Sequence, residues 1–517
     1  MHWLSKWPTW LRGAVEFGLV FGLSGLVFTW AQAMPTLADP DGYYHARFTA
    51  LMLQQGVIHE FPWLPLTTLG QAFADHHLLY HISLMPAVYW MGPLVGIKVM
   101  QALYVVLLVV VLYHLLKRWK IPFAGPALLL LFSSYPMLVR MDLPKASAVA
   151  VLLFVAIFAA LVERRYAWAG LLTVVYTMTH GGFFLAGVLA VVVWLADGIT
   201  SVIQHGRWRW TIPTGVFVVV GAMCLGVVSS PYFPSNIGFF WAQFFQIGVV
   251  NYHSVIQVGA EWYPFQLQHL IAAVSILLIG LVGVVAVTVV QWRQVFSRRI
   301  VVTLYLLLPI FFALTLRSRR FAEYFVPVLW LLVCVVALPA VQRGIISQWW
   351  QIMYKRLGKA MRWIEWYLIF GVTFAVVSVY PTLYQDFASQ ESVTEYAAVG
   401  GYLAAVTQPG DVVFHGQWDD FPQLFYYNPK AAYIVGLDAT FLYLADQELY
   451  QHWHDIASGL RKGATAADIR EYFGARYVVI NETREDTKLM YAYLLRDQSV
   501  QKVFSQNKIS VFDLGAQ

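Results

Sequence analysis

Apolar residues in the first 384 positions gather in long runs, and eleven of these are long enough to cross a membrane. Crossing about 30 Å of hydrocarbon takes roughly 20 apolar residues in a helix. A further stretch, 78–95, is amphipathic and is broken by Pro86 and Pro93, so we expect it to lie flat or to be re-entrant. The eleven runs lie near 13–33, 97–116, 121–139, 144–162, 166–180, 183–200, 211–230, 268–291, 300–316, 321–341 and 365–384.

The last part of the chain has a different pattern, in which helical segments alternate with short apolar runs at 411–415, 432–436 and 476–481. Thr465 begins a helix that ends at Gly474. This pattern predicts a small α/β domain that the last span anchors. The fold class is therefore a polytopic α-helical membrane protein with about 11–13 spans and a small C-terminal α/β soluble domain. The expected domains are 1–384, with outer loops 34–80 and 231–268, and 385–517.

Composition supports this division, because 59% of the residues are hydrophobic, 16% are aromatic and only 12% are charged. A soluble globular protein has about a quarter of its residues charged, and a disordered one is less hydrophobic. The net charge of +6 divides into +13 for residues 1–384 and −7 for residues 385–517. We expect membrane lipids around the first part and no nucleic-acid partner. The two cysteines lie in apolar runs, which excludes a disulfide framework and a cysteine zinc site.

The loop charges predict the orientation of the spans. With eleven spans and the N-terminus inside, 17 Lys and Arg residues lie on the cytoplasmic side and seven on the outer side of the membrane domain. Positive charge accumulates on the inner side, so this topology is favoured. Seven of the 11 acids lie on outer loops or outer helix ends, which indicates a pocket there. We expect an integral membrane protein, of a prokaryotic plasma membrane, with its active site and C-terminal domain extracytoplasmic.

The first outer loop begins with Asp39-Pro40-Asp41-Gly42, directly after the first span. Proline fixes one residue of this turn and glycine frees another, which places two carboxylates near the membrane surface. Such oxygen ligands suit Mg²⁺ or Mn²⁺. The alternative is an ordinary solvated turn that caps the following helix.

Histidines and one glutamate are the other candidates in the outer loops. His76 and His77 follow Asp75 and precede His81 by about one turn, so they are either metal ligands, an acid/base pair or interfacial histidines that only form hydrogen bonds. Glu261 is the only acid of loop 231–268. It is either a plain surface residue or a group on a mobile loop that closes over substrate.

Three arginines at the outer end of a span, Arg317, Arg319 and Arg320, break the charge rule that the other loops follow. Arginine matches phosphate oxygens bidentately, so the cluster predicts a site for a lipid-linked phosphate or diphosphate. The alternative is pairing with anionic headgroups or with Glu323. Arg140 and Asp142 form a second pair at a span end, where charges are usually functional or mutually neutralising.

With these motifs the chain resembles a C-type (GT-C) glycosyltransferase, and more closely the catalytic-subunit family of oligosaccharyltransferases. Asp41-Gly42-Tyr43 matches the family's first acidic motif, which implies that Asp41 binds metal and is catalytic. Arg140 and Asp142 lie where the family has its second acidic motif, although the fuller Asp-x-Asp or Asp-x-Glu form is absent. The segment Thr179-His180-Gly181-Gly182-Phe183 resembles the family's Trp-Gly-Gly-aromatic segment.

Three further matches lie later in the chain. Glu261 resembles the family's loop glutamate, and Arg320-Phe321 resembles its Arg-Phe diphosphate site. Trp418 and Asp419 are retained where the family has Trp-Trp-Asp-Tyr-Gly, the motif that recognises the acceptor Ser or Thr, which implies an acceptor-binding role for both.

The resulting hypothesis is inverting, metal-dependent transfer of a sugar or oligosaccharide from a polyprenyl phosphate or diphosphate to an acceptor on the outer face. Mg²⁺ or Mn²⁺ would be the cofactor, and the acceptor would be a protein, a lipid or a glycan. Asp41, Asp142 and Glu261 would hold the metal and orient the acceptor, with Asp39 as general base. The phosphate would bind Arg320 with Arg317, Arg319 and Arg140.

Two other classes stay open. One is a lipid or polysaccharide glycosyltransferase, or a protein O-mannosyltransferase, of the same fold. The other is a transporter of lipid-linked glycans, in which charges would line a path. Transporters usually show internal repeats and charges at the midplane. The sequence has no evident repeat, and its charges collect at the outer surface, which weighs against transport.

Overall fold

The computed structural model describes residues 8–208, 212–461 and 465–515. Lys6 and Arg209, which the charge argument counts as cytoplasmic, lie outside these residues. Contacts divide the chain into two compact units. Unit 1 comprises 1–34, 99–228 and 260–389, and unit 2 comprises 35–98, 229–259 and 390–517. Most of both outer loops therefore groups with the C-terminal part of the chain, whereas residues 260–268 of the second loop belong to unit 1.

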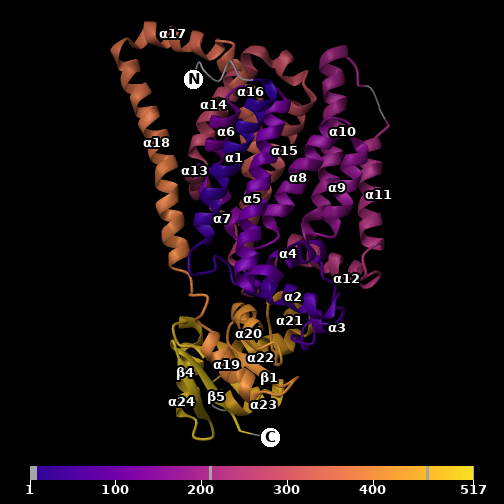
Figure 1. The fold of residues 1–517 in the computed structure, drawn as a ribbon, viewed down its shortest axis with the longest axis vertical. Helices are drawn as coiled ribbons and strands as arrows, with labels where there is room; N and C mark the ends of the chain where they lie inside the picture. Colours follow the sequence, from indigo (N-terminus) through magenta and orange to yellow (C-terminus); the bar gives the residue numbers. More distant parts are fainter. Residues whose placement is uncertain (1–7, 209–211, 462–464, 516–517) are drawn as a thin grey trace. The chain divides into compact units, whose positions relative to one another are not determined.

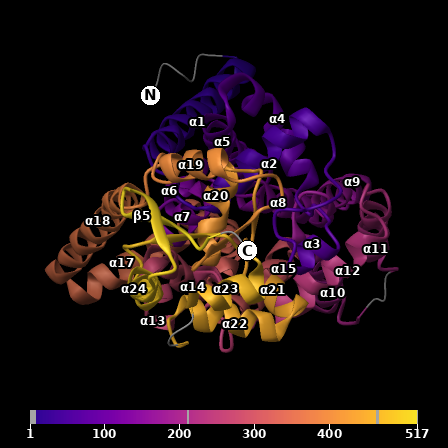
Figure 2. The same ribbon diagram turned by 90° about the horizontal axis from the view of Figure 1, so that it is seen from below.

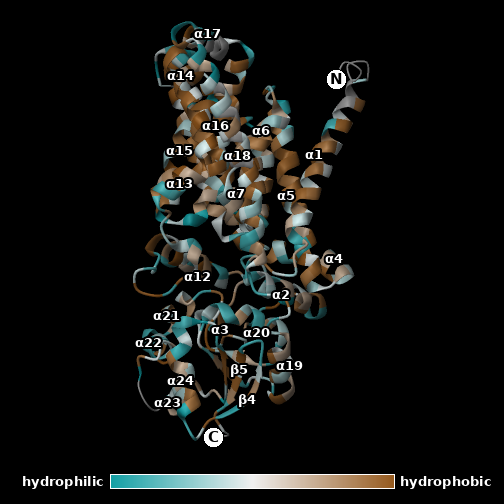
Figure 3. Cartoon of the chain, turned by 90° about the vertical axis from the view of Figure 1, so that its left-hand side faces the viewer, coloured by the Kyte–Doolittle hydropathy of each residue, from teal (hydrophilic) through white to brown (hydrophobic). Residues whose placement is uncertain are grey.

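Unit 1 is a helical bundle that contains the most apolar helices (Figures 1 and 3). Six helical segments of the described chain are long and apolar enough to span a membrane: α1 (Thr9–Gln32), α5 (Pro93–Arg118), α10 (Leu185–His205, with the preceding turn Gly181–Phe184), α14 (Ser275–Phe296), α15 (Arg299–Arg317) and α16 (Ala322–Gln342, with the turn Arg319–Phe321). They correspond to six of the predicted spans. The chain is an integral membrane protein.

The other predicted spans, apart from run 365–384, form bent or shorter helices. Run 121–139 divides into α6 (Ala124–Leu131) and α7 (Tyr135–Asp142), which meet at 84° and raise the span count to seven if they count as one. With a rise of 1.5 Å per residue, the next three are too short for an upright crossing. These are α8 (Ser147–Val162), α9 (Tyr166–Thr177) and α11 (Thr214–Val228). Run 365–384 lies in the long helix α18 (Lys359–Ala388), which follows α17 (Ile345–Leu357).

Helix α16 forms the centre of unit 1, because 83% of its most apolar 18-residue stretch is buried. A helix that is apolar on every side belongs in an interior, and α16 packs against α14, α15, α7 and α6. Trp330 of α16 donates a 2.6 Å hydrogen bond to the carbonyl of Ala127 in α6, so the buried indole N–H is satisfied. Short α13 (Leu267–Ala273) precedes α14.

The C-terminal part of unit 2 contains a five-stranded sheet with the order β2-β1-β3-β5-β4. Strand β1 (Val412–His415) pairs in parallel with β2 (Ala432–Tyr433) and β3 (Tyr477–Asn481). Strands β4 (Gln501–Gln506) and β5 (Ile509–Asp513) form an antiparallel hairpin that joins β3. The predicted small α/β domain is confirmed.

Helices cover both faces of this sheet (Figures 2 and 3). On one face lie α19 (Ala397–Val406) and α20 (Phe421–Tyr427); on the other lie α22 (Gln447–Ala457), α23 (Thr465–Phe473) and α24 (Lys488–Arg496). Short α21 (Thr440–Ala445) precedes α22. Helix α23 has the predicted bounds, since Gly474 follows it with φ +62°, a conformation that glycine adopts without steric cost.

The first outer loop packs on this domain within unit 2. It forms α2 (Asp41–Gln55), α3 (Thr68–Gln71) and α4 (Leu78–Met91). Arg47 of α2 donates a 2.7 Å hydrogen bond to the carbonyl of Tyr426, and the carbonyl of Trp63 accepts one of 2.8 Å from the N–H of Tyr433 at the sheet edge. The second loop forms α12 (Ser235–Trp241) and a π-helical segment, Ala242–Val250. Helix α4, with 14 residues, is not among the helices long and apolar enough to span a membrane; Pro86 lies inside it, and Pro93 begins α5.

Candidate functional site

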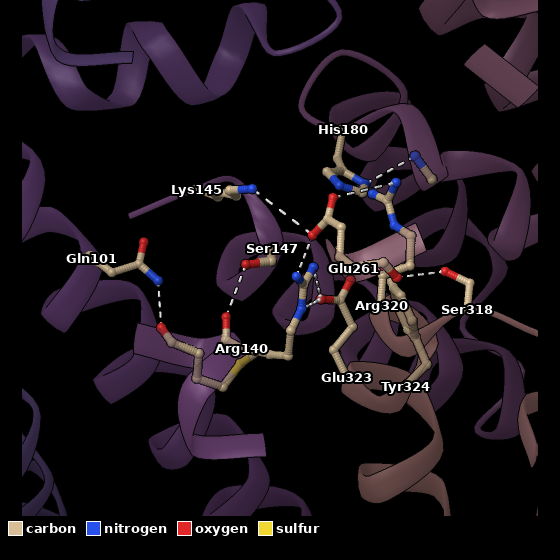
Figure 4. Close-up of polar contacts among 12 residues, drawn as sticks. Gln101, Arg140, Lys145, Ser147, His180, Glu261, Ser318, Arg320, Glu323 and Tyr324 are labelled. Carbon is tan, nitrogen blue, oxygen red and sulfur yellow. Dashed lines mark hydrogen bonds and ion pairs between the residues drawn. The ribbon is translucent and has the colours of Figure 1, made fainter. Parts of the chain in front are cut away.

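Arg140 lies at the centre of a buried charge cluster in unit 1 (Figure 4). Its Nε and Nη2 donate to Oε2 of Glu323 at 2.9 and 2.8 Å, and its Nη1 donates to Oε2 of Glu261. The Glu323 side chain is fully buried at the first turn of α16, and Glu261 comes from the turn Ala260–Trp262. Glu323 therefore pairs with Arg140 rather than with the three arginines after α15, its alternative partners from sequence.

Glu261 is shared by three cations. Besides Arg140, Lys145 Nζ lies 3.9 Å from Oε2 and Arg320 Nη1 lies 4.0 Å from Oε1. Burial by itself raises the pKa of Glu261, but Lys145, Arg140 and Arg320 outweigh it and hold that pKa well below its usual range. The Glu261 carboxylate therefore stays ionised. Its ion pairs connect Arg140 in α7 and Lys145 just after α7 to Arg320 in the turn before α16.

Arg320 is held in place by its neighbours. Its guanidinium lies 4.3 Å from the centroid of the Trp262 ring, a cation–π contact. Ser318 Oγ donates a 2.9 Å hydrogen bond to the carbonyl of Glu261, and the N–H of Arg319 donates to the carbonyl of Tyr263 at 3.1 Å. The turn 318–321 and the turn 260–263 thus form one structural element. Arg317 ends α15, and Arg317 and Arg319 are exposed.

The cluster has an excess of positive charge, since Arg140, Lys145 and Arg320 face two carboxylates. The Arg140 side chain is 10% exposed, whereas Lys145, Glu261 and Arg320 are 17–22% exposed. Solvent therefore reaches the side that carries Lys145 and Arg320. A partly buried site with two such cations suits a phosphate, and the Glu261 carboxylate occupies the position of an anion between them.

Three side chains fix the end of α7, which carries both Arg140 and Asp142. Ser147 Oγ donates to the carbonyl of Arg140 at 3.1 Å, Gln101 to that of Met141, and Gln32 to that of Asp142 at 2.7 Å. These groups satisfy carbonyls that a helix end leaves without intrahelical partners. Asp142 is 1% exposed, and its Oδ2 has no hydrogen-bond partner in the described part of the chain.

Asp39 and Asp41 lie at the start of α2 in unit 2. Asp39 Oδ1 accepts a 2.9 Å hydrogen bond from the N–H of Asp41, and its carbonyl accepts one from Gly42. Asp41 is the first residue of the helix, where a negative charge is stabilised by the helix dipole. The two acidic motifs therefore belong to different units, Asp41 to unit 2 and Asp142 to unit 1.

The histidines of the first loop form a buried chain in unit 2. His81 Nδ1 lies 2.7 Å from Oδ2 of Asp75, and its Nε2 lies 2.8 Å from Nδ1 of His45. The rings of His76 and His77 are in contact, with centroids 3.8 Å apart and planes tilted by 42°. Among the described residues, no group of three or more His, Cys, Asp or Glu is placed to hold a metal ion.

The motif in the C-terminal domain is a 3₁₀ turn, Trp418–Asp420, after β1. Arg484 Nη2 lies 3.2 Å from Oδ2 of Asp419, and Tyr396 donates a 2.6 Å hydrogen bond to Oδ1 of buried Asp420. Burial raises the pKa of Asp420, and the adjacent Asp419 carboxylate raises it further. Asp420 is a buried carboxyl group that the sequence did not single out.

Sequence reasoning did not assign Lys145, Glu323 or Ser318 to the site. Lys145 follows Asp142 by three residues and was counted only as an outer base. A basic residue so close to a candidate acidic motif was the available signal. For Ser318 and Glu323 the sequence held no such signal, because their partners are 57 and 183 residues away.

A bundle of apolar helices with a charge cluster at one helix end and a small α/β domain defines a known class. The chain has the fold of the GT-C glycosyltransferases. The resemblance stated from sequence is therefore confirmed for the fold. No protein-family model matches the sequence, and no curated protein matches it.

Three solved structures illustrate the similarity. The archaeal oligosaccharyltransferase AglB from Archaeoglobus fulgidus, in complex with an inhibitory peptide and a dolichol-phosphate, matches with a TM-score of 0.64 and 11% identity, over 92% of this chain and 71% of AglB. ArnT from Cupriavidus metallidurans, bound to undecaprenyl phosphate, has a TM-score of 0.57 and 14% identity over 97% and 99% of the two chains. The arabinofuranosyltransferase AftD from Mycobacteria has a TM-score of 0.58 and 13% identity over 97% of this chain and 40% of AftD. Another AglB structure is a complex with Zn and sulfate.

Proposed function

We propose that this chain is an inverting glycosyltransferase that uses a polyprenyl phosphate or diphosphate sugar. The observation that carries the proposal is the cluster of Arg140, Lys145 and Arg320 around Glu261. A lipid-linked donor leaves as a phosphate anion, and preorganised cations in a partly buried site stabilise the charge that develops on it. The fold and the lipid phosphates bound by AglB and ArnT support the same donor class.

Arg320 and Lys145 are the phosphate-binding residues in this proposal. Their contacts to Glu261, at 4.0 and 3.9 Å, are longer than the 2.8–2.9 Å contacts between Arg140 and Glu323. Arg140 is therefore a positioning residue that is held by two carboxylates. Its positive charge acts on the phosphate without direct contact. Arg317 and Arg319, which are exposed, attract the anionic donor and add to the field at the site.

The reaction is a single displacement. The acceptor nucleophile attacks the anomeric carbon while the bond from that carbon to the phosphate oxygen breaks, and the electron pair stays on the phosphate. Attack from the opposite face inverts the anomeric centre. The acceptor proton goes to the carboxylate of Asp39, which we assign as the general base. Asp41 is the second catalytic carboxylate. Glu261 orients the acceptor once its own carboxylate has left Lys145 and Arg320.

We further propose that Asp142 in unit 1 and Asp41 in unit 2 are each a ligand for Mg²⁺ or Mn²⁺, as the resemblance implies for Asp41. The buried Oδ2 of Asp142, without a hydrogen-bond partner among the described residues, fits a metal ligand, and carboxylates are the ligands these ions prefer. When bound, the ion would neutralise charge on the leaving phosphate. The rings of His76 and His77 are in contact with each other, so we rank these histidines below the two aspartates as candidates for the metal.

The acceptor is assigned by analogy to the oligosaccharyltransferase motif. Trp418 and Asp419 would bind it, as the resemblance implies for a protein acceptor. A second candidate is transfer to a lipid or polysaccharide, including O-mannosyl transfer by the same fold. Its support is the coverage with ArnT, 97% of this chain and 99% of ArnT, together with the reduced Trp-Asp motif.

We also propose that the site is extracytoplasmic in a prokaryotic plasma membrane. The bases near the other ends of the spans support this orientation. Arg118 pairs with Glu163. Arg299, the first residue of α15, pairs with Asp197, whereas Arg320 lies beyond the other end of α15. The cation-rich ends of these helices correspond to the side that the charge rule places inside.

Mass spectrometry of membrane lipids and glycoconjugates tests the function in a host that lacks the endogenous gene. Complementation with the wild-type gene should restore one glycoconjugate and consume one lipid-linked sugar. Arg320→Ala should leave the lipid-linked sugar accumulated, while Arg496→Ala, an exposed arginine of α24, should behave as wild type. Unchanged lipid and glycan profiles with properly inserted Arg320→Ala protein would overturn the proposal.

A further inference from the structure

A second basic site lies in unit 1 at the opposite helix ends from Arg320. It is a cavity of about 300 Å³ between the turn 119–121, the end of α14, the start of α15 and the end of α16. Arg298 precedes α15, whereas Arg320 follows it, and 19 residues of helix span about 28 Å. The cavity is therefore separate from the charge cluster around Glu261.

Three cations line the cavity, namely Lys120, Arg298 and Arg343, and no acid does. Arg298 donates to the carbonyl of Val335 at 2.9 Å and Arg343 to that of Pro339 at 3.2 Å. None of the three forms an ion pair within the described ranges of the chain. No described acidic side chain therefore compensates their charge.

Neighbouring bases at the same helix ends behave differently. Lys117 pairs with Glu16 at 2.7 Å, Arg118 with Glu163 at 2.7 Å, and Arg299 with Asp197 at 2.8 Å. Lys120 and Arg298 are within a few residues of these paired bases but face the cavity instead. General accumulation of positive charge on this side does not explain why the unpaired ones meet at one concave site.

The surroundings of Arg298 favour the binding of an anion. Arg298 is half-buried, and both its burial and the positive charge of Arg343 lower its pKa. Two guanidinium groups that repel each other in a partly desolvated site are stabilised when a negative charge binds between them. Arg298 is the N-terminal boundary of α15 and lies outside the spans.

Most of the remaining lining residues are apolar and come from the spans, whereas Gln291 and Gln294 are polar. Val287, Val295, Val301 and Val336 are at most 7% exposed and form its buried side. The wall is interrupted at Gln291, where α14 leaves helical geometry with φ −125° and ψ 34°. The cavity thus combines cationic side chains with buried apolar side chains at the ends of the spans. This combination matches a ligand with a phosphate group attached to an apolar part.

We propose that this cavity binds a phosphate-bearing anion, with Arg298, Arg343 and Lys120 contacting the phosphate oxygens. The chemistry is shared by two sources, the headgroup of an anionic membrane lipid and a free phosphate ester. Because the site joins the ends of α14, α15 and α16, the bound anion stabilises the packing of these helices. The inference does not depend on the proposed catalytic function.

Thermal unfolding of the full-length protein in neutral detergent tests this inference. Phosphatidylglycerol should raise the Tm of the wild type by several degrees relative to phosphatidylcholine. The double variant Arg298→Gln/Arg343→Gln should require at least tenfold more phosphatidylglycerol for half the shift. A matched control, Lys355→Gln/Arg356→Gln in α17, removes the same charge from exposed residues and should respond as wild type.

The same Tm measurement is repeated with glycerol 3-phosphate, a free phosphate ester, in place of the lipid. A shift with the lipid alone assigns the site to a headgroup, and a shift with both assigns it to phosphate esters in general. The proposal is overturned if the double variant responds to phosphatidylglycerol as wild type does, or if neither compound shifts the wild type. If the double variant does not fold, Arg343→Gln, which changes an exposed side chain, should still weaken the response about threefold, and an unchanged response would overturn the proposal equally.

Discussion

Ser318 Oγ donates a 2.9 Å hydrogen bond to the backbone carbonyl of Glu261, and so connects the turn that carries Arg320 to the loop that carries the glutamate. The two residues are 57 positions apart, yet the bond places an acid and a cation of the proposed donor site in one rigid element. Donor phosphate and Glu261 then compete for the same cations, because Arg320 and Lys145 both contact that carboxylate.

Ser318→Ala should loosen this element without removing a charge. A buried hydrogen bond contributes about 0.5–1.5 kcal/mol, so we expect the donor KM to rise roughly 2- to 10-fold with a smaller change in kcat. Steady-state kinetics with the lipid-linked donor check this, with Ser389→Ala at the end of α18 as control. Equal KM values for wild type and Ser318→Ala would show that the turn is held by its other contacts.

Glu261→Gln should separate phosphate binding from turnover. The substitution removes the negative charge that occupies the position between Lys145 and Arg320, so pyrophosphate should bind the ligand-free protein about tenfold more tightly. Turnover should fall, since Glu261 is assigned to orient the acceptor. Isothermal titration with pyrophosphate measures the first effect. Weaker binding than in the wild type would mean that Glu261 supports the anion site rather than occupying it.

The same residue predicts a stability change in acid. Burial opposes the charged form, but the three cations depress the folded-state pKa of Glu261 below its unfolded value of 4.5. A depressed carboxyl pKa contributes stability that is present above the unfolded pKa and is lost as pH falls below it. The Tm of the wild type should therefore drop more steeply below about pH 4.5 than that of Glu261→Gln. Parallel Tm profiles would contradict the ion-pair assignment.

Asp420 in the C-terminal domain predicts the opposite pH dependence. Burial and the neighbouring Asp419 raise its folded-state pKa, so the folded domain retains a proton that the unfolded chain releases. Stability is then present below the unfolded pKa and is lost as pH rises through the folded one. Hydrogen exchange of residues 412–427 in the full-length protein should become faster with rising pH, beyond the intrinsic effect, and Asp420→Asn should abolish this excess. Exchange of 501–513 is an internal control.

The sequence predicted the fold class because long apolar runs and the alternation in the tail depend on local composition. It predicted single members of the site, Arg140, Glu261 and Arg320, from their unusual positions. It did not predict that Glu323 pairs with Arg140, since the two residues are 183 positions apart and Arg320 is a closer neighbour in sequence. Hydropathy also did not show the bend between α6 and α7, although Pro136 in the first turn of α7 was a signal for a new helix start.

Asp142 combines a stability cost with a functional assignment, and the two can be measured separately. Its Oδ2 is buried without a hydrogen-bond partner in the part of the chain that the structure describes. A buried, unsatisfied polar group costs about 1–3 kcal/mol. Asp142→Asn keeps a polar group of the same shape but removes the charge, whose burial costs more than that of a neutral amide, so the metal-free protein should become more stable. Chemical unfolding in the presence of a chelator measures this change.

The functional half of this prediction uses Mn²⁺ binding, followed by electron paramagnetic resonance, as a readout independent of activity. If Asp142 and Asp41 are metal ligands, then Asp142→Asn and Asp41→Asn should each weaken Mn²⁺ binding at least tenfold and lower turnover. Asp142→Asn should thus be more stable and less active, the combination expected when a buried carboxylate is retained for function. Glu395→Gln, a carboxylate of unit 2 with no assigned role, serves as control. Mn²⁺ binding that is unchanged in both aspartate variants would remove the metal from the proposed mechanism and leave the cations around Glu261 as its only source of charge stabilisation.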